Sequence, residues 1–155
     1  MRRTNKPSPP PHFYWNPTLT VTTSAPPESA LAALVDALVG ARYQVLDRGP
    51  GRAELRIGSF WREHVSDSLG LSITPILPTW AFRATVDLEV LDTAPPTQVR
   101  VLMHKKEEPK LALAHLLRAV EAALQTLRAA DHHAEAGEVG EGPRRERRAG
   151  SRWRR

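Results

Sequence analysis

Between Phe82 and Val90 every second residue is apolar, and the residues between them are polar or charged. The segment reads FRATVDLEV, and a period of two is typical of a β-strand and not of a helix. One face of this strand, predicted over residues 80–91, therefore packs on a core while the other faces water, as in antiparallel sheets. After the turn DTAPP a second alternating strand is predicted at residues 97–105, and the two form a hairpin.

A long amphipathic helix is predicted after this hairpin, over residues 107–130. Its apolar side chains recur at helical spacing: Leu113, Leu116, Leu117, Val120, Leu124 and Leu127. At about 1.5 Å per residue this helix would be about 35 Å long, which is enough to lie across a five-stranded sheet. It is thus expected to cover the apolar sheet face.

The segment before residue 59 supplies the remaining elements. Alternation, helical periodicity and a Gly-Pro-Gly turn predict a strand at 18–23, a helix at about 26–40 and a hairpin of strands 43–48 and 52–59. Ser24 or Ala25 is expected to cap the first helix. The order β-α-β-β-loop-β-β-α predicts an α+β fold, a two-layer sandwich in which two helices cover one face of an antiparallel sheet of about five strands.

Positive charge is concentrated at the two ends of the chain. Residues 1–16 carry a formal charge of +3, residues 143–155 carry +6, and the part between them carries −4. The domain itself is therefore mildly acidic and gives no sign of a basic face for nucleic acid. From composition we predict three regions: a disordered proline-rich arm at 1–17, a single α+β domain at 18–130, and a disordered Gly/Arg-rich tail at 131–155.

The chain has no cysteine, which excludes disulfides, thiolate catalysis and cysteine-ligated metal sites. No apolar run approaches the about 20 residues needed to span a bilayer, so no transmembrane segment is predicted. The basic N-terminus is not followed by the apolar region of a secretory signal. We therefore expect a cytoplasmic location, and the sequence does not predict an oligomeric state.

The histidines and serines do not predict a catalytic or metal site. His64 lies near Glu63, Asp67 and several serines, so a small hydrolase is a third hypothesis, but there is no G-x-S-x-G motif. His132 and His133 are adjacent, and adjacent helical residues point in different directions. We expect no catalytic residue, no metal and no cofactor.

Charged residues on the predicted strands have a structural explanation. Asp87 and Glu89 share one strand face and are expected to form cross-strand ion pairs with Arg83 and Arg100. His104 is expected on the polar face of its strand. These side chains are therefore interpreted as the polar surface of the sheet.

The connection from residue 59 to residue 80 is unusually apolar and long for a compact domain. It either folds back over a sheet edge or the open end of the core, or it forms the lip of a site for a ligand, a partner or a membrane surface. Under the second hypothesis the ligand- or partner-binding residues are Phe60, Trp61, Ile73, Ile76, Leu77 and Trp80.

The arginine-rich tail admits two interpretations. It is either a solvated end or a segment that binds nucleic acid weakly and without sequence preference through charge, with a tryptophan that can stack on a base. The nucleic-acid-binding residues would then be Arg144, Arg145, Arg147, Arg148, Arg152, Trp153, Arg154 and Arg155.

The segment LTVTTSAPPESALAALVDALVGARYQV, residues 19–45, resembles the start of START-like (SRPBCC) helix-grip domains. Those domains open with a strand and a proline-marked helix start, and a long C-terminal helix is clasped by their antiparallel sheet. The resemblance implies an apolar cavity for a lipid or another hydrophobic small molecule.

Two functions follow from these observations. The first is a non-enzymatic binding module for a hydrophobic small molecule or a protein partner. The alternative is a nucleic-acid-associated accessory protein that acts through the arginine tail.

Overall fold

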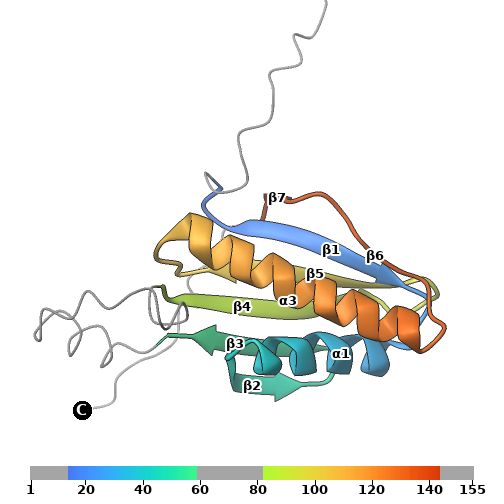
Figure 1. Cartoon of the computed structure of the whole chain (residues 1–155). Coiled ribbons are helices and arrows are strands. Elements are labelled where there is room, and N and C mark those ends of the chain that lie inside the picture. The colour runs from blue at the N-terminus through green and yellow to red at the C-terminus, as the bar shows by residue number, and fades with distance from the viewer. Residues whose placement is uncertain (1–13, 59–81, 144–155) are drawn as a thin grey trace, which may run out of the picture.

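The computed structural model of the chain describes residues 14–58 and 82–143, which form one sheet and two helices (Figure 1). The elements follow in the order predicted from the sequence, and two short strands are added after the last helix. Their bounds are β1 Pro17–Thr23, α1 Pro27–Gly40, β2 Gln44–Gly49, β3 Arg52–Ile57, β4 Ala84–Asp92, β5 Thr97–His104, α3 Pro109–Ala129, β6 Ala134–Ala136 and β7 Gly140–Glu141.

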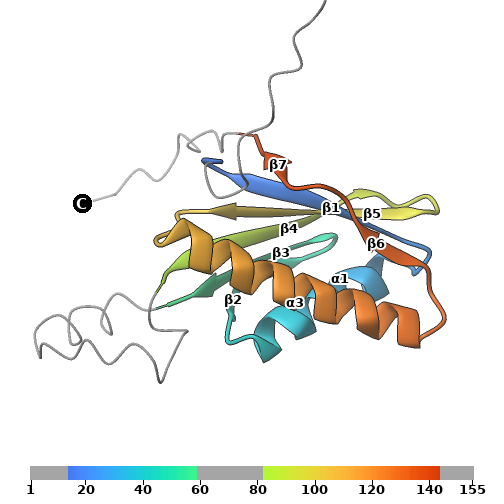
Figure 2. The same cartoon turned by 45° about the horizontal axis from the view of Figure 1, so that its top comes forward.

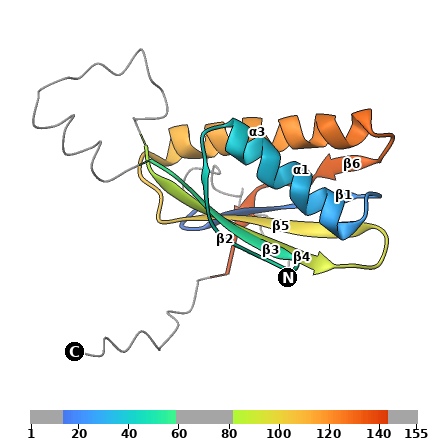
Figure 3. The ribbon, with the colours of Figure 1, turned by 90° about the horizontal axis from the view of Figure 1, so that it is seen from below.

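The sheet has the strand order β2-β3-β4-β5-β1-β6, and β7 also pairs with β1. All pairs are antiparallel. Both helices lie on the same side of the sheet, with α3 lying obliquely over the strands (Figures 2 and 3). The other side, which we call the open face, carries no helix in the described part of the chain. The predicted α+β two-layer sandwich is confirmed.

The core lies between the two helices and the sheet. The alternation that predicted β4 is confirmed, because Ala84, Val86 and Leu88 are buried against the helices. The predicted stripe of α3 is buried except for Leu117, which is exposed. Burying one such leucine or valine contributes about 1.5–3 kcal/mol, so this layer supplies much of the stability of the fold.

The start of α1 differs from the predicted cap. Pro26 occupies the N-cap position, and no side chain caps the helix. The oxygen of the Thr23 side chain accepts a hydrogen bond from the backbone N–H of Ala25 at 3.1 Å. Ser24 Oγ instead accepts the N–H of His133 at 2.9 Å. The predicted capping by Ser24 or Ala25 was wrong, because Ser24 joins the chain before α1 to the segment that follows α3.

The boundary predicted at residue 130 was also wrong. β6 and β7 continue the fold past α3 by pairing with β1, and Ala134 is buried. The carboxylate of Glu141 accepts hydrogen bonds from the backbone N–H groups of Trp15 and Asn16 at 3.0 and 2.9 Å. The described sheet thus continues past α3 to Glu141, and the N–H of Gly142 donates to the carbonyl oxygen of Asn16 at 2.7 Å. Backbone pairing stabilises these polar segments, and apolar periodicity does not reveal it.

Residues 1–13 of the predicted arm and residues 144–155 of the predicted tail lie outside the described residues. The whole apolar connection 59–80 also lies outside them. Among the helices that are described, none combines the length and the apolar character needed to cross a membrane.

Candidate functional site

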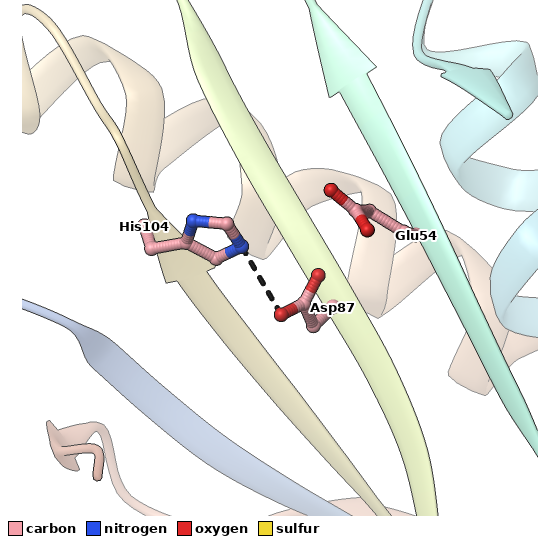
Figure 4. Close-up of side chains that lie close together, drawn as sticks. All are labelled: Glu54, Asp87 and His104. Atoms are coloured by element: carbon pink, nitrogen blue, oxygen red, sulfur yellow. Dashed lines mark ion pairs between the residues drawn. The ribbon is translucent and has the colours of Figure 1, made fainter. Parts of the chain in front are cut away.

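Three polar side chains meet on the open face, at the middle of the sheet. They come from the adjacent strands β3, β4 and β5. The strand register places Glu54 directly opposite Asp87. His104 lies opposite Thr85, one residue pair further along the same face. Because side chains alternate along a strand, Glu54, Asp87 and His104 all point away from the helices and converge (Figure 4).

The geometry of this cluster is tight. His104 Nε2 lies 3.1 Å from Asp87 Oδ2. One ligand-type atom from each of the three residues can be chosen so that all three lie within 4.8 Å of one another. His104 is buried, with 4% of its surface exposed, whereas Glu54 and Asp87 are half-buried. The prediction that His104 lies on the polar face was correct, but its side chain is buried from solvent.

The cluster can perform two kinds of chemistry. A carboxylate next to an imidazole can fix the orientation of the ring and share a hydrogen bond with it. An imidazole and two carboxylates can also act together as ligands of a divalent metal ion. The His104–Asp87 contact serves the first role by itself, and Glu54 adds the third donor that the second role requires.

Ion pairs surround the cluster on the same face. Arg100 pairs with Glu89 across β4 and β5, as predicted. Arg83 pairs with Glu107, which follows β5, and their backbones are joined by a hydrogen bond from Glu107 N–H to the Arg83 carbonyl oxygen at 2.7 Å. Asp87 contacts the buried His104, which lies two residues along β5 from Leu102, the residue directly opposite Asp87.

A pocket of about 890 Å³ opens beside the cluster. Its walls come from the first turn of α1, the hairpin of β2 and β3, and β4. Glu54 and Asp87 line the pocket, so the cluster and the pocket share two residues. The charged lining is predominantly acidic, with two arginines against five carboxylates: Arg48 and Arg52 against Glu28, Asp47, Glu54, Asp87 and Glu89.

A separate aromatic group lies inside the core, where α1 ends. Tyr43 and His115 stack with ring centroids 5.8 Å apart, and Phe82 packs on the same imidazole at 5.3 Å. His115 Nε2 lies 2.7 Å from the carbonyl oxygen of Ala41 and donates to it. The Tyr43 hydroxyl is buried without a hydrogen-bond partner among the described residues, and burial raises the pKa of Tyr43 above its ordinary value.

The sequence-predicted sites cannot be compared with this geometry. The proposed apolar lip, from Phe60 to Trp80, and the proposed nucleic-acid-binding residues, from Arg144 to Arg155, lie outside the described residues. The cluster of Glu54, Asp87 and His104 was not predicted. Its only sequence signal is that each residue falls on the polar phase of its strand, and the register that brings them together is not visible in the sequence.

Comparisons with protein-family models, with curated proteins and with solved structures found no match to this chain.

Proposed function

We propose that this protein is a non-enzymatic binding module for a hydrophobic small molecule or a protein partner. Of these two ligand classes, we propose that a protein partner occupies its pocket. The pocket between α1 and the β2–β3 hairpin carries this proposal. Pockets that bind small hydrophobic molecules are lined mainly by apolar side chains. Here seven of the sixteen lining residues are charged, which favours a polar polypeptide segment.

The strand next to the pocket supports the same occupant. Among the described strands, β2 is the last at its end of the sheet, and every residue from Gln44 to Arg48 is exposed. Val45 and Leu46 expose 43% and 47% of their surface. An exposed edge strand offers backbone donors and acceptors to an added strand, and its side chains supply apolar contacts.

The same strand indicates what kind of partner fits. Its register is interrupted between Val45 and Asp47, and Asp47 and Arg48 follow directly. Bulges and charges on an edge strand resist pairing between identical copies. The acidic lining of the pocket favours a segment with positive charge. A different protein with a basic, partly apolar segment is therefore the occupant we propose.

Selection of peptides from a random displayed library against the immobilised full-length chain tests the proposal. Enriched peptides should carry net positive charge and apolar residues. Leu46→Asp should weaken their binding by at least about tenfold, because an interfacial apolar contact becomes a buried charge. Leu117→Asp, on the helix layer, should leave binding unchanged. The proposal would be contradicted if the enriched peptides bound the Leu46→Asp variant as tightly as the unaltered chain, or if no sequence were enriched.

The alternative function, nucleic-acid binding through the arginine tail, has support from composition alone. The pocket in the described part of the chain is acidic, so affinity for phosphate groups is expected from the tail and not from this surface. The closing prediction of the Discussion tests it.

A further inference from the structure

We propose that Glu54, Asp87 and His104 form a binding site for a divalent transition-metal ion, with Zn²⁺ as the preferred ion. This inference does not depend on the proposed partner binding, because it rests on the cluster alone. The site would lie on the open face, at one wall of the pocket.

The spacing of the three side chains fits one ion. Zn²⁺ binds nitrogen and oxygen ligands at about 2.0–2.2 Å, so two ligand atoms in a tetrahedral site lie about 3.3–3.6 Å apart. In the cluster the three separations do not exceed 4.8 Å, and His104 Nε2 lies 3.1 Å from Asp87 Oδ2. Rotations of the half-buried Glu54 and Asp87 side chains that move their oxygens by about 1 Å therefore complete the site.

The scaffold that holds these donors is rigid. The three residues project from three neighbouring strands in the middle of the sheet, joined by continuous antiparallel pairing. Sites built on paired strands are held more accurately than sites on loops. The buried imidazole of His104 directs Nε2 toward the carboxylates. A metal site of this kind needs little reorganisation when the ion binds.

The types of donor select the class of ion. Imidazole nitrogen suits Zn²⁺ and its transition-metal neighbours, whereas Ca²⁺ and Mg²⁺ prefer sites made only of oxygen. Three protein ligands leave one tetrahedral position for water or for a group from a molecule in the pocket. We therefore expect Zn²⁺ to bind more tightly than Mn²⁺, and both more tightly than Mg²⁺.

The His104–Asp87 pair involves two of the three residues. A metal ion would also contact Glu54, which stands directly opposite Asp87 on the neighbouring strand. A dication that contacts both carboxylates attracts each of them. Glu54 is thus the residue whose role differs between a simple ion pair and a metal site.

The experiment uses the full-length chain after treatment with a chelator and dialysis. Titration with Zn²⁺, followed by calorimetry and by competition with a chromophoric chelator, should show one site per chain. Glu54→Gln keeps the His104–Asp87 pair and should weaken Zn²⁺ binding by more than about tenfold. Glu89→Gln, on the same face but paired with Arg100, should leave the affinity unchanged.

Two further measurements keep the result unambiguous. Thermal melts of each variant without metal show whether Glu54→Gln is folded, and only a folded variant is titrated. His133→Ala removes an exposed histidine near Glu135 that could bind Zn²⁺ at the surface, and it should have no effect. Zn²⁺ binding that survives Glu54→Gln, or that disappears with His133→Ala, would overturn the proposal, as would the absence of a site in the unaltered chain.

Discussion

At the scale of single residues, the open face shows how far side-chain roles can be read from a sequence. The Arg100–Glu89 pair could be predicted because both residues lie on the polar phase of adjacent hairpin strands. The contact of Asp87 with His104 could not, because it is diagonal and depends on the burial of one imidazole. Residue type and strand phase predict which face a side chain occupies, but not which of several neighbours it contacts.

Tyr43 gives a prediction at this scale. Its hydroxyl is buried without a hydrogen-bond partner among the described residues, so Tyr43→Phe removes a group whose burial costs free energy. We expect the free energy of unfolding at pH 7 to stay equal or to rise by up to about 1 kcal/mol. Urea denaturation checks this, with Tyr14→Phe, which replaces the other tyrosine of the chain, as the control.

The same substitution should change the alkaline limit of stability. Burial raises the pKa of Tyr43 in the folded protein, whereas the unfolded chain releases the phenolic proton near pH 10. Stability from the neutral buried ring is therefore complete below about pH 10 and decreases as the pH rises above it. Tyr43→Phe should flatten this decrease. A loss of more than about 1 kcal/mol at pH 7 would instead indicate that the hydroxyl makes a stabilising contact.

At the scale of elements, strong periodicity predicted each helix and each long strand. The two short strands β6 and β7, which are held by backbone pairing, were not predicted. The stripe of α3 is confirmed from Leu113 to Leu127, apart from Leu117. β6 and β7 are three and two residues long. Segments this short show no apolar period, and their position depends on the exposed edge of β1, which is a property of the folded chain and not of their own residues.

Two truncations test the contribution of these short strands. A chain ending at Pro143 keeps β6 and β7, and it should match the unfolding midpoint of the full chain. A chain ending at His133 loses both strands, the buried Ala134 and the hydrogen bonds that Glu141 accepts. We expect this chain to fold cooperatively, but its free energy of unfolding should fall by about 2–4 kcal/mol, because each lost hydrogen bond contributes about 0.5–1.5 kcal/mol.

Urea denaturation followed by circular dichroism measures both truncated chains under the same conditions. Equal midpoints for the two would mean that β6 and β7 do not stabilise the sheet. An earlier boundary of the fold, near residue 130, would then be correct after all.

At the scale of the whole molecule, the layer architecture could be predicted and the candidate site could not. One apolar sheet face and two amphipathic helices can form a core in few ways, and a two-layer sandwich is the simplest of them. The site depends on the register between β3, β4 and β5. A shift of one residue would move Glu54 or Asp87 to the helix side, and turn geometry and core packing, which fix the register, are properties of the assembled fold.

The distribution of charge over the whole chain gives the last prediction. Seven arginines lie in residues 143–155, whereas the part between the two basic ends carries −4. Neutralising about four to six phosphates should give affinities of about 10⁻⁴ to 10⁻⁶ M near physiological salt, with a steep salt dependence and no sequence preference. Fluorescence anisotropy with labelled DNA and RNA at two salt concentrations measures this binding.

Removing residues 143–155 should abolish the binding, because an acidic domain and a short arm of charge +3 then remain. Replacing the seven arginines with serine in the full-length chain separates charge from chain length, and it should have the same effect. Residual sequence-independent binding would place the basic contacts in the N-terminal arm. Tight binding by the truncated chain would mean that a surface of the domain recognises nucleic acid despite its acidic pocket, and the alternative function would then replace the proposed one.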